Sequence, residues 1–328
     1  MDPTSNLIAQ VDQQILRENL LYLCKDPLPV RKLNYTLPGH SKSTLDEADD
    51  FIVSKLESYG YEIEKEPVNV QAFRCDIFKP KSSQYSSPEP DDPWYTAHNL
   101  YAKKTGSVHP DEITVVVSHK DSQSWVDSPG ANDNGVGTVS NMEIARILSD
   151  HDSSRSIWFL YCNEEHRPWT SVTAAEGMAN AGLNVIAVLN IDSISGKSAA
   201  VTDKGLRTNI TRYTTDEGEA LADRMIELNE KYEIGLHQGK SHLPRPGDDD
   251  GSFINAGFPN AILNIGSYPY AEPNYHHESD TFETVDFENV ALATQLSMAF
   301  ILHVDRNGVR SACHQVGAMK MLFGNVGQ

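Results

Sequence analysis

Several apolar segments of this sequence are followed by residues that bind metals or transfer protons. The segment "ITVVVS" leads into His119 and Asp121, and "SIWFLYCN" leads into Glu164 and Glu165. A third segment, "NVIAVLNI", leads into Asp192. Each segment has the length and the β-branched or aromatic content of a buried strand. Imidazoles and carboxylates at the ends of such strands can ligate metal ions or act as acids and bases.

Two further stretches carry the same kinds of side chain. In "SPGANDNGVG", Asp133 stands in a glycine-flanked turn at the start of a predicted helix. Such a turn lets the backbone approach a ligand closely, and it places the carboxylate at a positive helix end. The loop "YHHESDT" follows the apolar segment "NAILNIG" and carries His276 and His277. These residues complete a set of histidines and carboxylates without thiolates.

The set indicates a divalent metal site. Mixed nitrogen and oxygen donors suit zinc, or another first-row divalent metal, at a site with open coordination positions. A carboxylate shared by two ions about 3.5 to 4 Å apart is the usual bridge of a two-metal hydrolytic centre. Taken singly, a histidine or aspartate after a strand is more often a turn former or a cap, and the glutamate pair also fits a solvated loop. The hypothesis therefore depends on all these residues emerging on one side of one sheet.

The elements that must position these residues alternate along the chain. Strand-like segments are separated by helical patterns such as "GVGTVSNMEIARILSD", "TSVTAAEGMANAG" and "EGEALADRMIELNEKY". This alternation predicts an α/β fold with a mixed, largely parallel central sheet and helices on both of its faces. In open sheets of this kind, ligands bind beyond the carboxyl ends of the strands, where the candidate residues stand.

The 328 residues are enough for one large domain or two ordinary ones. We predict a single domain over residues 1–305, with helices in residues 1–60 packed on it and a last helix from about Phe287 to His303. The segment 79–95 is rich in Ser, Pro and Asp, which predicts a surface loop. No structure is predicted for the tail at 306–328.

Composition excludes several classes of function. The net charge of -19, from 46 acidic and 27 basic residues, argues against nucleic acid as a partner, because every phosphate would be repelled. No segment approaches the roughly 20 apolar residues of a membrane span, so no membrane partner is expected. The first residues lack the apolar core of a signal peptide. We therefore expect a cytoplasmic protein, or a secreted one whose leader has been removed.

The motifs carry a resemblance to a known family. "HKDS", "PGANDNGVG", "NEE", "NIDS" and "YHHESDT", in that order, resemble the two-zinc exopeptidases of clan MH, family 28. These enzymes include the bacterial leucyl aminopeptidases and their carboxypeptidase relatives. The likeness runs from about Asn99 to Asp305 and is weaker over the N-terminal helices. Each motif is weak alone, but five in order are specific.

The resemblance implies a ligand set for two zinc ions per chain. Carried over residue by residue, it makes Asp133 the bridging ligand. His119 and Asp192 complete one ion, and Glu165 and His276 complete the other. We prefer His276 to His277 because it stands four residues before an Asp-Thr pair, as in the family pattern.

The resemblance also implies roles in catalysis and substrate binding. Glu164 would be the general base; neighbouring residues at a strand end point in different directions, so Glu165 can bind metal while Glu164 faces the reacting water. Asp121 would orient His119, as carboxylates do for ligating imidazoles. Tyr275 matches a tyrosine that hydrogen-bonds the substrate carbonyl in some members. The stretch "GDDDGSFINAGFPN" resembles the lining of the substrate pocket, so Asp249 and Phe253 are candidate contacts.

Three departures from the family pattern lie near the expected pocket. Lys120 occupies a position that is often aromatic, and Asp250 stands where an aromatic residue or a histidine is common. Arg167, in "HRPWTS", replaces one of the usual small or apolar residues. Its guanidinium suits a substrate carboxylate, although a structural ion pair with a nearby acid is the more common role of such a residue.

The sequence therefore predicts a metal-dependent exopeptidase, in the first place an aminopeptidase that acts on peptides or small amides. Carboxypeptidase and dipeptidase activities stay open, as do the native metal and the oligomeric state. One alternative is a single-zinc transferase resembling glutaminyl cyclase, which the full five-ligand set disfavours. Another is a non-catalytic binding protein that kept the fold, which the intact Glu164 disfavours.

Overall fold

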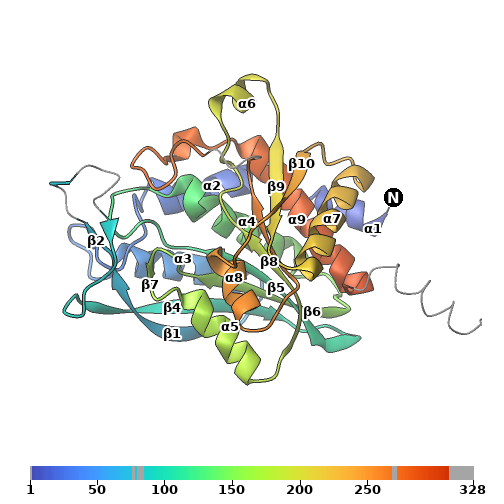
Figure 1. The fold of residues 1–328 in the computed structure, drawn as a ribbon, viewed down its shortest axis with the longest axis horizontal. Coiled ribbons are helices and arrows are strands. Elements are labelled where there is room, and N and C mark those ends of the chain that lie inside the picture. The colour runs from blue at the N-terminus through green and yellow to red at the C-terminus, as the bar shows by residue number, and fades with distance from the viewer. Residues whose placement is uncertain (1, 76–77, 80–84, 268–271, 310–328) are drawn as a thin grey trace, which may run out of the picture.

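A nine-stranded mixed sheet forms the centre of the molecule (Figure 1). The structure is a computed structural model that describes residues 2–75, 78–79, 85–267 and 272–309. The strands of this sheet are β1 (Ile63–Ala72), β4 (Trp94–Lys104), β5 (His109–His119), β6 (Arg155–Cys162), β7 (His166–Arg167), β8 (Asn184–Ile191), β9 (Thr208–Tyr213), β10 (His237–His242) and β11 (Ala261–Ile265). Two short strands, β2 (Arg74–Cys75) and β3 (Tyr85–Ser86), pair separately.

The sheet has the order β10-β9-β11-β8-β5-β6-β4-β1-β7. Its centre is parallel, because β5 pairs in parallel with both β6 and β8, and β8 pairs in parallel with β11. Strands β4, β1 and β7 add on one side by antiparallel pairing, and β9 pairs antiparallel to β11. The predicted mixed α/β fold is confirmed, with its parallel part at the sheet centre.

Helices cover both faces of the sheet, as predicted. The helices are α1 (Pro3–Ile8), α2 (Gln13–Cys24), α3 (Thr44–Ser58), α4 (Val136–Leu148), α5 (Thr170–Asn180), α6 (Ala199–Asp203), α7 (Asp216–Lys231), α8 (Asp248–Asn255) and α9 (Phe287–Asn307). The larger core cluster joins the sheet to α2, α3, α4, α7 and α9, and a second cluster joins the other face to α5 and α8.

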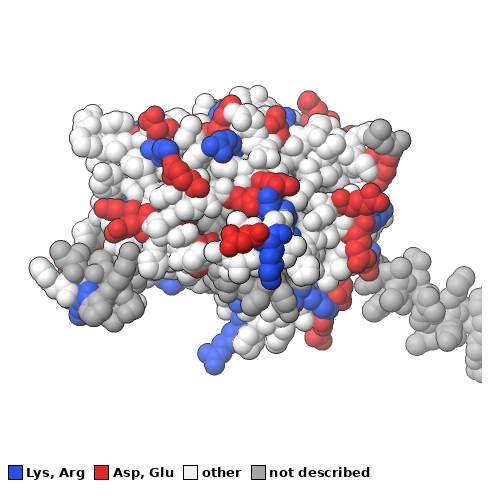
Figure 2. Space-filling view, turned by 90° about the horizontal axis from the view of Figure 1, so that it is seen from above, with Lys and Arg blue, Asp and Glu red and all other residues white. Residues whose placement is uncertain are grey.

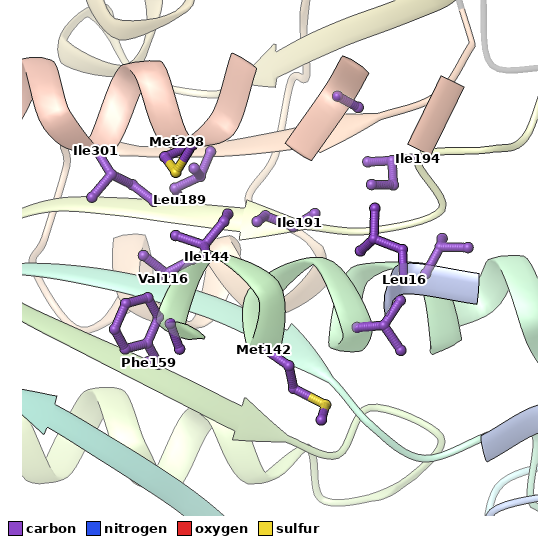
Figure 3. Packing of buried hydrophobic residues seen from close by; sticks show 14 of the residues in the cluster. Leu16, Val116, Met142, Ile144, Phe159, Leu189, Ile191, Ile194, Met298 and Ile301 are labelled. Atoms are coloured by element: carbon purple, nitrogen blue, oxygen red, sulfur yellow. The ribbon is translucent and has the colours of Figure 1, made fainter. Parts of the chain in front are cut away.

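The side chains of β5 point alternately into the two core clusters. Val116 belongs to the larger cluster, whereas its neighbours Val115 and Val117 belong to the second. Successive residues of a strand point to opposite faces, so a strand buried on both faces has a continuous apolar sequence. Figure 3 shows Val116 with Phe159 of β6 and Ile144 of α4 in the larger cluster. Full burial of each such side chain contributes about 1.5 to 3 kcal/mol.

Side-chain caps define the helices of the N-terminal region. The Ser43 hydroxyl accepts a hydrogen bond from the Asp46 amide (3.1 Å), and α3 is followed by Gly60 at φ +91°, as its sequence predicts. Apolar residues also recur at helical spacing from Leu7 to Leu20, but this segment does not form one helix. Asp12 caps a new helix by accepting from the Gln14 amide (2.7 Å), so the chain breaks between α1 and α2.

Strands β9 and β10 and helix α8 were not predicted. Strand β9 has the sequence "TNITRY", and β10 has the polar sequence "HQGKSH". Because β10 is an edge strand paired only with β9, it buries no apolar face and shows no strand pattern in its sequence. Helix α8 begins with three aspartates, and its buried face includes Phe253.

The boundaries near the chain ends also differ from expectation. Helix α9 ends at Asn307 rather than near residue 303, and the predicted tail beyond residue 309 lies outside the described residues. The predicted loop at 79–95 contains β3 and the start of β4, and its residues 80–84 lie outside the described residues. The extent of the single domain stays a prediction.

Helix α9 is long and apolar enough to cross a membrane by length and composition alone. Within this helix, 78% of an 18-residue apolar stretch is buried. Helix α9 packs against α4 and α7, as the core helix of a globular fold does. On the face shown in Figure 2, acidic side chains are spread among basic and uncharged ones. This distribution fits the large negative net charge.

Candidate metal centre and active site

Three adjacent parallel strands bring the predicted ligands to one edge of the sheet. Strand β5 ends at His119, whose register partner on β6 is Cys162, so Glu164 and Glu165 follow just beyond that level. On the other side of β5, β8 ends directly before Asp192. The carboxyl ends of parallel strands lie at the same edge, which is why separate sequence motifs converge here.

Asp133 lies between the two predicted histidine ligands. Its Oδ1 is 3.2 Å from His119 Nε2, and its Oδ2 is 3.2 Å from His276 Nε2. Each histidine also faces a second carboxylate. His119 Nε2 lies 3.7 Å from Asp192 Oδ2, and His276 Nε2 lies 3.5 Å from Glu165 Oε1. The structure thus forms two histidine-carboxylate pairs that share one aspartate.

The donor atoms are close enough to share an ion. One atom from each of His119, Asp133 and Glu165 lies within 4.8 Å of the others, and the same holds for His119, Glu164 and Asp192. These residues are buried. In contrast, His277 is exposed, and the structure brings His276 rather than His277 onto the cluster.

The cluster fits divalent cations. Several buried carboxylates face two imidazoles, and burying like charges without a cation is costly. Burial lowers the pKa of His276, but the carboxylates of Asp133 and Glu165 outweigh it and raise that pKa to about 10. The mixed oxygen and nitrogen donors are those of a zinc site.

Asp121 contacts both His119 and the backbone of the glutamate pair. Its Oδ1 lies 3.2 Å from His119 Nδ1 and accepts from the Glu164 amide (2.9 Å). Its Oδ2 accepts from the Glu165 amide (2.8 Å) and lies 2.8 Å from His166 Nδ1. Burial opposes its ionisation, but the bonds to His119 and His166 outweigh burial and hold the pKa of Asp121 well below its usual range. A single carboxylate therefore orients the His119 imidazole and the backbone of the glutamate pair.

We expect Asp121→Asn to weaken zinc binding by about 10- to 100-fold, the usual effect of losing a carboxylate behind a ligating histidine. The amide keeps the size of the side chain but cannot accept all four bonds. Zinc competition titration against a chromogenic chelator measures the effect. Asp127→Asn, which changes an exposed carboxylate in the same loop, is the control. Equal zinc affinity in both variants would contradict this role of Asp121.

Asp280 fixes the turn that carries Asp133. Its Oδ1 accepts from the Asn132 amide (2.8 Å), and its Oδ2 accepts from the Asp133 amide (2.9 Å). Burial, together with the charge of Asp133, raises the pKa of Asp280 to about 7. The sequence marked Asp280 only by its spacing from His276, so this contact across the chain was not anticipated.

Arg31 is a second residue that the sequence analysis missed. Its guanidinium is fully buried and donates to the carbonyls of Lys120 (2.7 Å), Pro129 (2.7 Å) and Gly130 (2.8 Å). It thereby joins the two ends of the loop between His119 and Asp133. No local pattern marks this arginine in the sequence, because its partners are backbone carbonyls far along the chain.

The unusual Lys120 has a structural partner. Its fully buried ammonium lies 2.7 Å from Asp49 Oδ1 on α3 and donates to Asn163 Oδ1 (2.9 Å). Burial raises the pKa of Asp49, and the charge of Lys120 acts against that rise. Lys120 therefore joins the N-terminal helices to the residues that precede the glutamate pair.

Glu164 lies beside the cluster in an acidic environment. Its Oε2 is buried and makes no hydrogen bond within the part of the chain that the structure describes. Burial and the nearby charges of Asp249 and Asp248 raise the pKa of Glu164 well above its usual value. Asp249 is itself fully buried and accepts from Cys162 Sγ (3.0 Å), and Asp250 is buried next to it on α8.

The remaining predicted residues differ in their access to substrate. Tyr275 is exposed, and its ring stacks on His276 with 3.7 Å between centroids. Phe253 is fully buried in the second core cluster, with its ring 6.2 Å from that of Phe258, so we leave it out of the proposed substrate contacts. Arg167 is exposed and stacks on aromatic rings, and no ion pair of its guanidinium is found among the described residues.

Comparisons with known proteins agree with this architecture. The model of peptidase family M28 matches residues 99–301. A probable zinc metalloprotease of Pyrenophora teres f. teres is 26% identical over 322 residues, covering 81% of this chain and 62% of that protein. A probable aminopeptidase of Saccharomyces cerevisiae is 25% identical and covers 63% of this chain and 57% of that protein. The chain thus spans about 60% of the length of these curated relatives.

Solved structures share the fold. An aminopeptidase from Aneurinibacillus sp. strain AM-1 superposes with a TM-score of 0.68 at 15% identity, covering 92% of this chain and 96% of that chain. LapB from Legionella pneumophila superposes with a TM-score of 0.70 at 19% identity, covering 93% and 75%. The family model covers more than half of the sequence and spans all five candidate ligand motifs. The chain therefore belongs to peptidase family M28.

Proposed function

We propose that this protein is an aminopeptidase that uses two zinc ions per chain to hydrolyse the N-terminal bond of peptides. The observation that carries the proposal is the position of Asp133, whose two carboxylate oxygens each lie 3.2 Å from a different histidine. Asp192 and Glu165 supply the second carboxylate on either side. This symmetrical arrangement supports a bridged two-ion site.

The candidate ligands would divide between two ions. His119 and Asp192 would hold one ion, Glu165 and His276 would hold the other, and Asp133 would serve both. Zinc, when bound, would supply Lewis-acid polarisation of the substrate carbonyl and a lower pKa for bound water. Asp121 keeps the His119 imidazole and the glutamate backbone in position through the bonds described above.

Glu164 performs the proton transfers in this proposal. Its buried Oε2, with no hydrogen-bond partner in the described part of the chain, accepts a proton from the attacking water. The same carboxyl group then gives that proton to the departing amine, so the peptide bond breaks without releasing an unstable anion. Tyr275, stacked on His276 at the exposed side of the site, donates a hydrogen bond to the substrate carbonyl oxygen as charge develops there.

The electrostatics of the site favour a substrate amino terminus. The Glu164 carboxyl lies near those of Asp249 and Asp248, whose charges act on it. A cationic α-amino group is attracted to such a group of acids, whereas a substrate carboxylate would be repelled from it. This supports removal of the first residue of a peptide rather than of the last.

Metal removal and reconstitution test the proposal. We expect two zinc ions per chain after reconstitution, and hydrolysis of aminoacyl p-nitroanilides that disappears with a chelator and returns with zinc. N-blocked versions of the same substrates should not be cleaved. One ion per chain, with cyclisation of an N-terminal glutaminyl peptide, would support the single-zinc transferase instead. A failure to bind zinc would support a binding protein that kept the fold.

A further inference from the structure

Arg167 lies at the edge of the site with a charged group that the proposed chemistry does not use. It stands two residues after Glu165 on β7, which pairs with β1 through Gln71 and Ala72. Its Cζ lies 5.2 Å from the centroid of the Phe73 ring and 4.4 Å from that of the Trp169 ring. The strand pairing and the two rings fix the position of the exposed guanidinium.

A row of aromatic rings connects Arg167 with the metal ligands. The Phe73 ring packs edge-on against Trp125, with 4.0 Å between centroids. Trp125 in turn packs edge-on against His276, with 5.6 Å between centroids. Because each contact is short, the guanidinium lies within reach of a peptide held at His276. An extended peptide of two to four residues spans about 7 to 14 Å.

The guanidinium is free to bind a carboxylate. Contact with the two rings engages the charge of the group rather than its N–H donors, and arginine stays charged at any physiological pH. Within the described residues Arg167 forms no ion pair, even though the chain has an excess of acidic residues. The sequence-based expectation of a structural ion pair is therefore not met by the described residues. A planar fork of donors binds a carboxylate bidentately.

We propose that Arg167 binds the free α-carboxylate at the C-terminus of a short peptide whose first bond is cleaved. This inference rests on the proposed aminopeptidase function and narrows its substrates to peptides of about two to four residues. The amino terminus of the substrate lies at the acidic side of the metal cluster, near Glu164 and Asp249. Its carboxylate lies at the opposite, basic end of the aromatic row.

The test compares peptides that differ only in their C-terminal charge. Alanine and leucine di-, tri- and tetrapeptides are assayed as free acids and as C-terminal amides with zinc-loaded protein. For at least one length we expect kcat/KM to favour the acid by about 10- to 100-fold, the effect of a hydrogen-bonded charge pair. Arg167→Gln should remove this preference by raising KM for the acids, with the amides unchanged. Arg167→Lys should restore part of it.

Arg17 offers a matched control. It is an exposed arginine whose Cζ lies 4.9 Å from each of two aromatic rings, those of Phe282 and Phe287, but it stands on α2. Arg17→Gln should keep the preference for acids. Equal cleavage of acids and amides by the wild-type protein, or equal losses on both in Arg167→Gln, would overturn the inference while leaving the aminopeptidase function intact. Absence of cleavage of every peptide by fully loaded protein would overturn both.

Discussion

Glu164→Gln should lower kcat by about 10²- to 10⁴-fold, the usual contribution of a general acid-base residue. Glutamine has the shape of glutamate but cannot take up a proton. The backbone at this position should not move, because the Glu164 amide still donates to Asp121. Steady-state hydrolysis of an aminoacyl p-nitroanilide measures the effect, and Glu57→Gln on the exposed side of α3 is the control.

Metal content distinguishes this role of Glu164 from that of a ligand. One Glu164 oxygen lies close enough to His119 and Asp192 to join a shared ion. If Glu164 acts only as the base, the glutamine variant keeps the zinc content of the wild-type protein, whereas Glu165→Ala loses zinc. Loss of zinc in Glu164→Gln would make it a ligand, and near-normal turnover would exclude it as the base.

Asp133→Asn should have the largest effect on metal binding. Loss of a carboxylate behind a ligating histidine usually weakens metal binding by about 10- to 100-fold. We expect a larger loss of zinc affinity here. The reason is geometric: both Asp133 oxygens face a histidine, so an amide nitrogen in place of either oxygen removes a ligand from one ion and the charge from both. Inductively coupled plasma mass spectrometry after dialysis measures the zinc content, and hydrolysis should fall with it.

Asp280→Asn provides a graded comparison, since Asp280 contacts only the backbone of the same turn. Asp280→Asn should weaken zinc binding less than Asp133→Asn does, because the Asp280 carboxylate accepts from backbone amides and contacts neither His119 nor His276 within the described residues. Circular dichroism of both metal-free variants checks that the fold is intact. Full zinc occupancy in Asp133→Asn would show that this residue does not bridge the ions.

The central strands of the sheet could be predicted from the sequence of each strand alone. Strands β5, β6 and β8 are buried on both faces, so their sequences are continuous apolar segments. The edge strand β10 has no such constraint, since it is paired on one side only and its residues are polar. The break between α1 and α2 leaves no mark on the apolar pattern, which continues past Asp12 although the Asp12 side chain starts a new helix.

The supporting residues of the site were harder to find than the ligands. Arg31 and Asp280 act through backbone groups that are about 90 to 150 positions away in the chain. A hydrogen bond to a distant carbonyl or amide leaves no mark on the sequence around either partner. The contact between His166 and Asp121 is likewise formed only when β5 and β6 lie side by side.

The sequence by itself determined which candidate metal-binding residues this protein carries. The identities of His119, Asp133, Glu165, Asp192 and His276, and their places after apolar segments, were enough to predict a metal site in an α/β fold. Only the tertiary structure decided that Asp133 faces both histidines, and that Arg167 lacks an acidic partner among the described residues. Residue type and local pattern are properties of short segments, whereas these juxtapositions depend on strand order, register and packing between segments far apart in the chain.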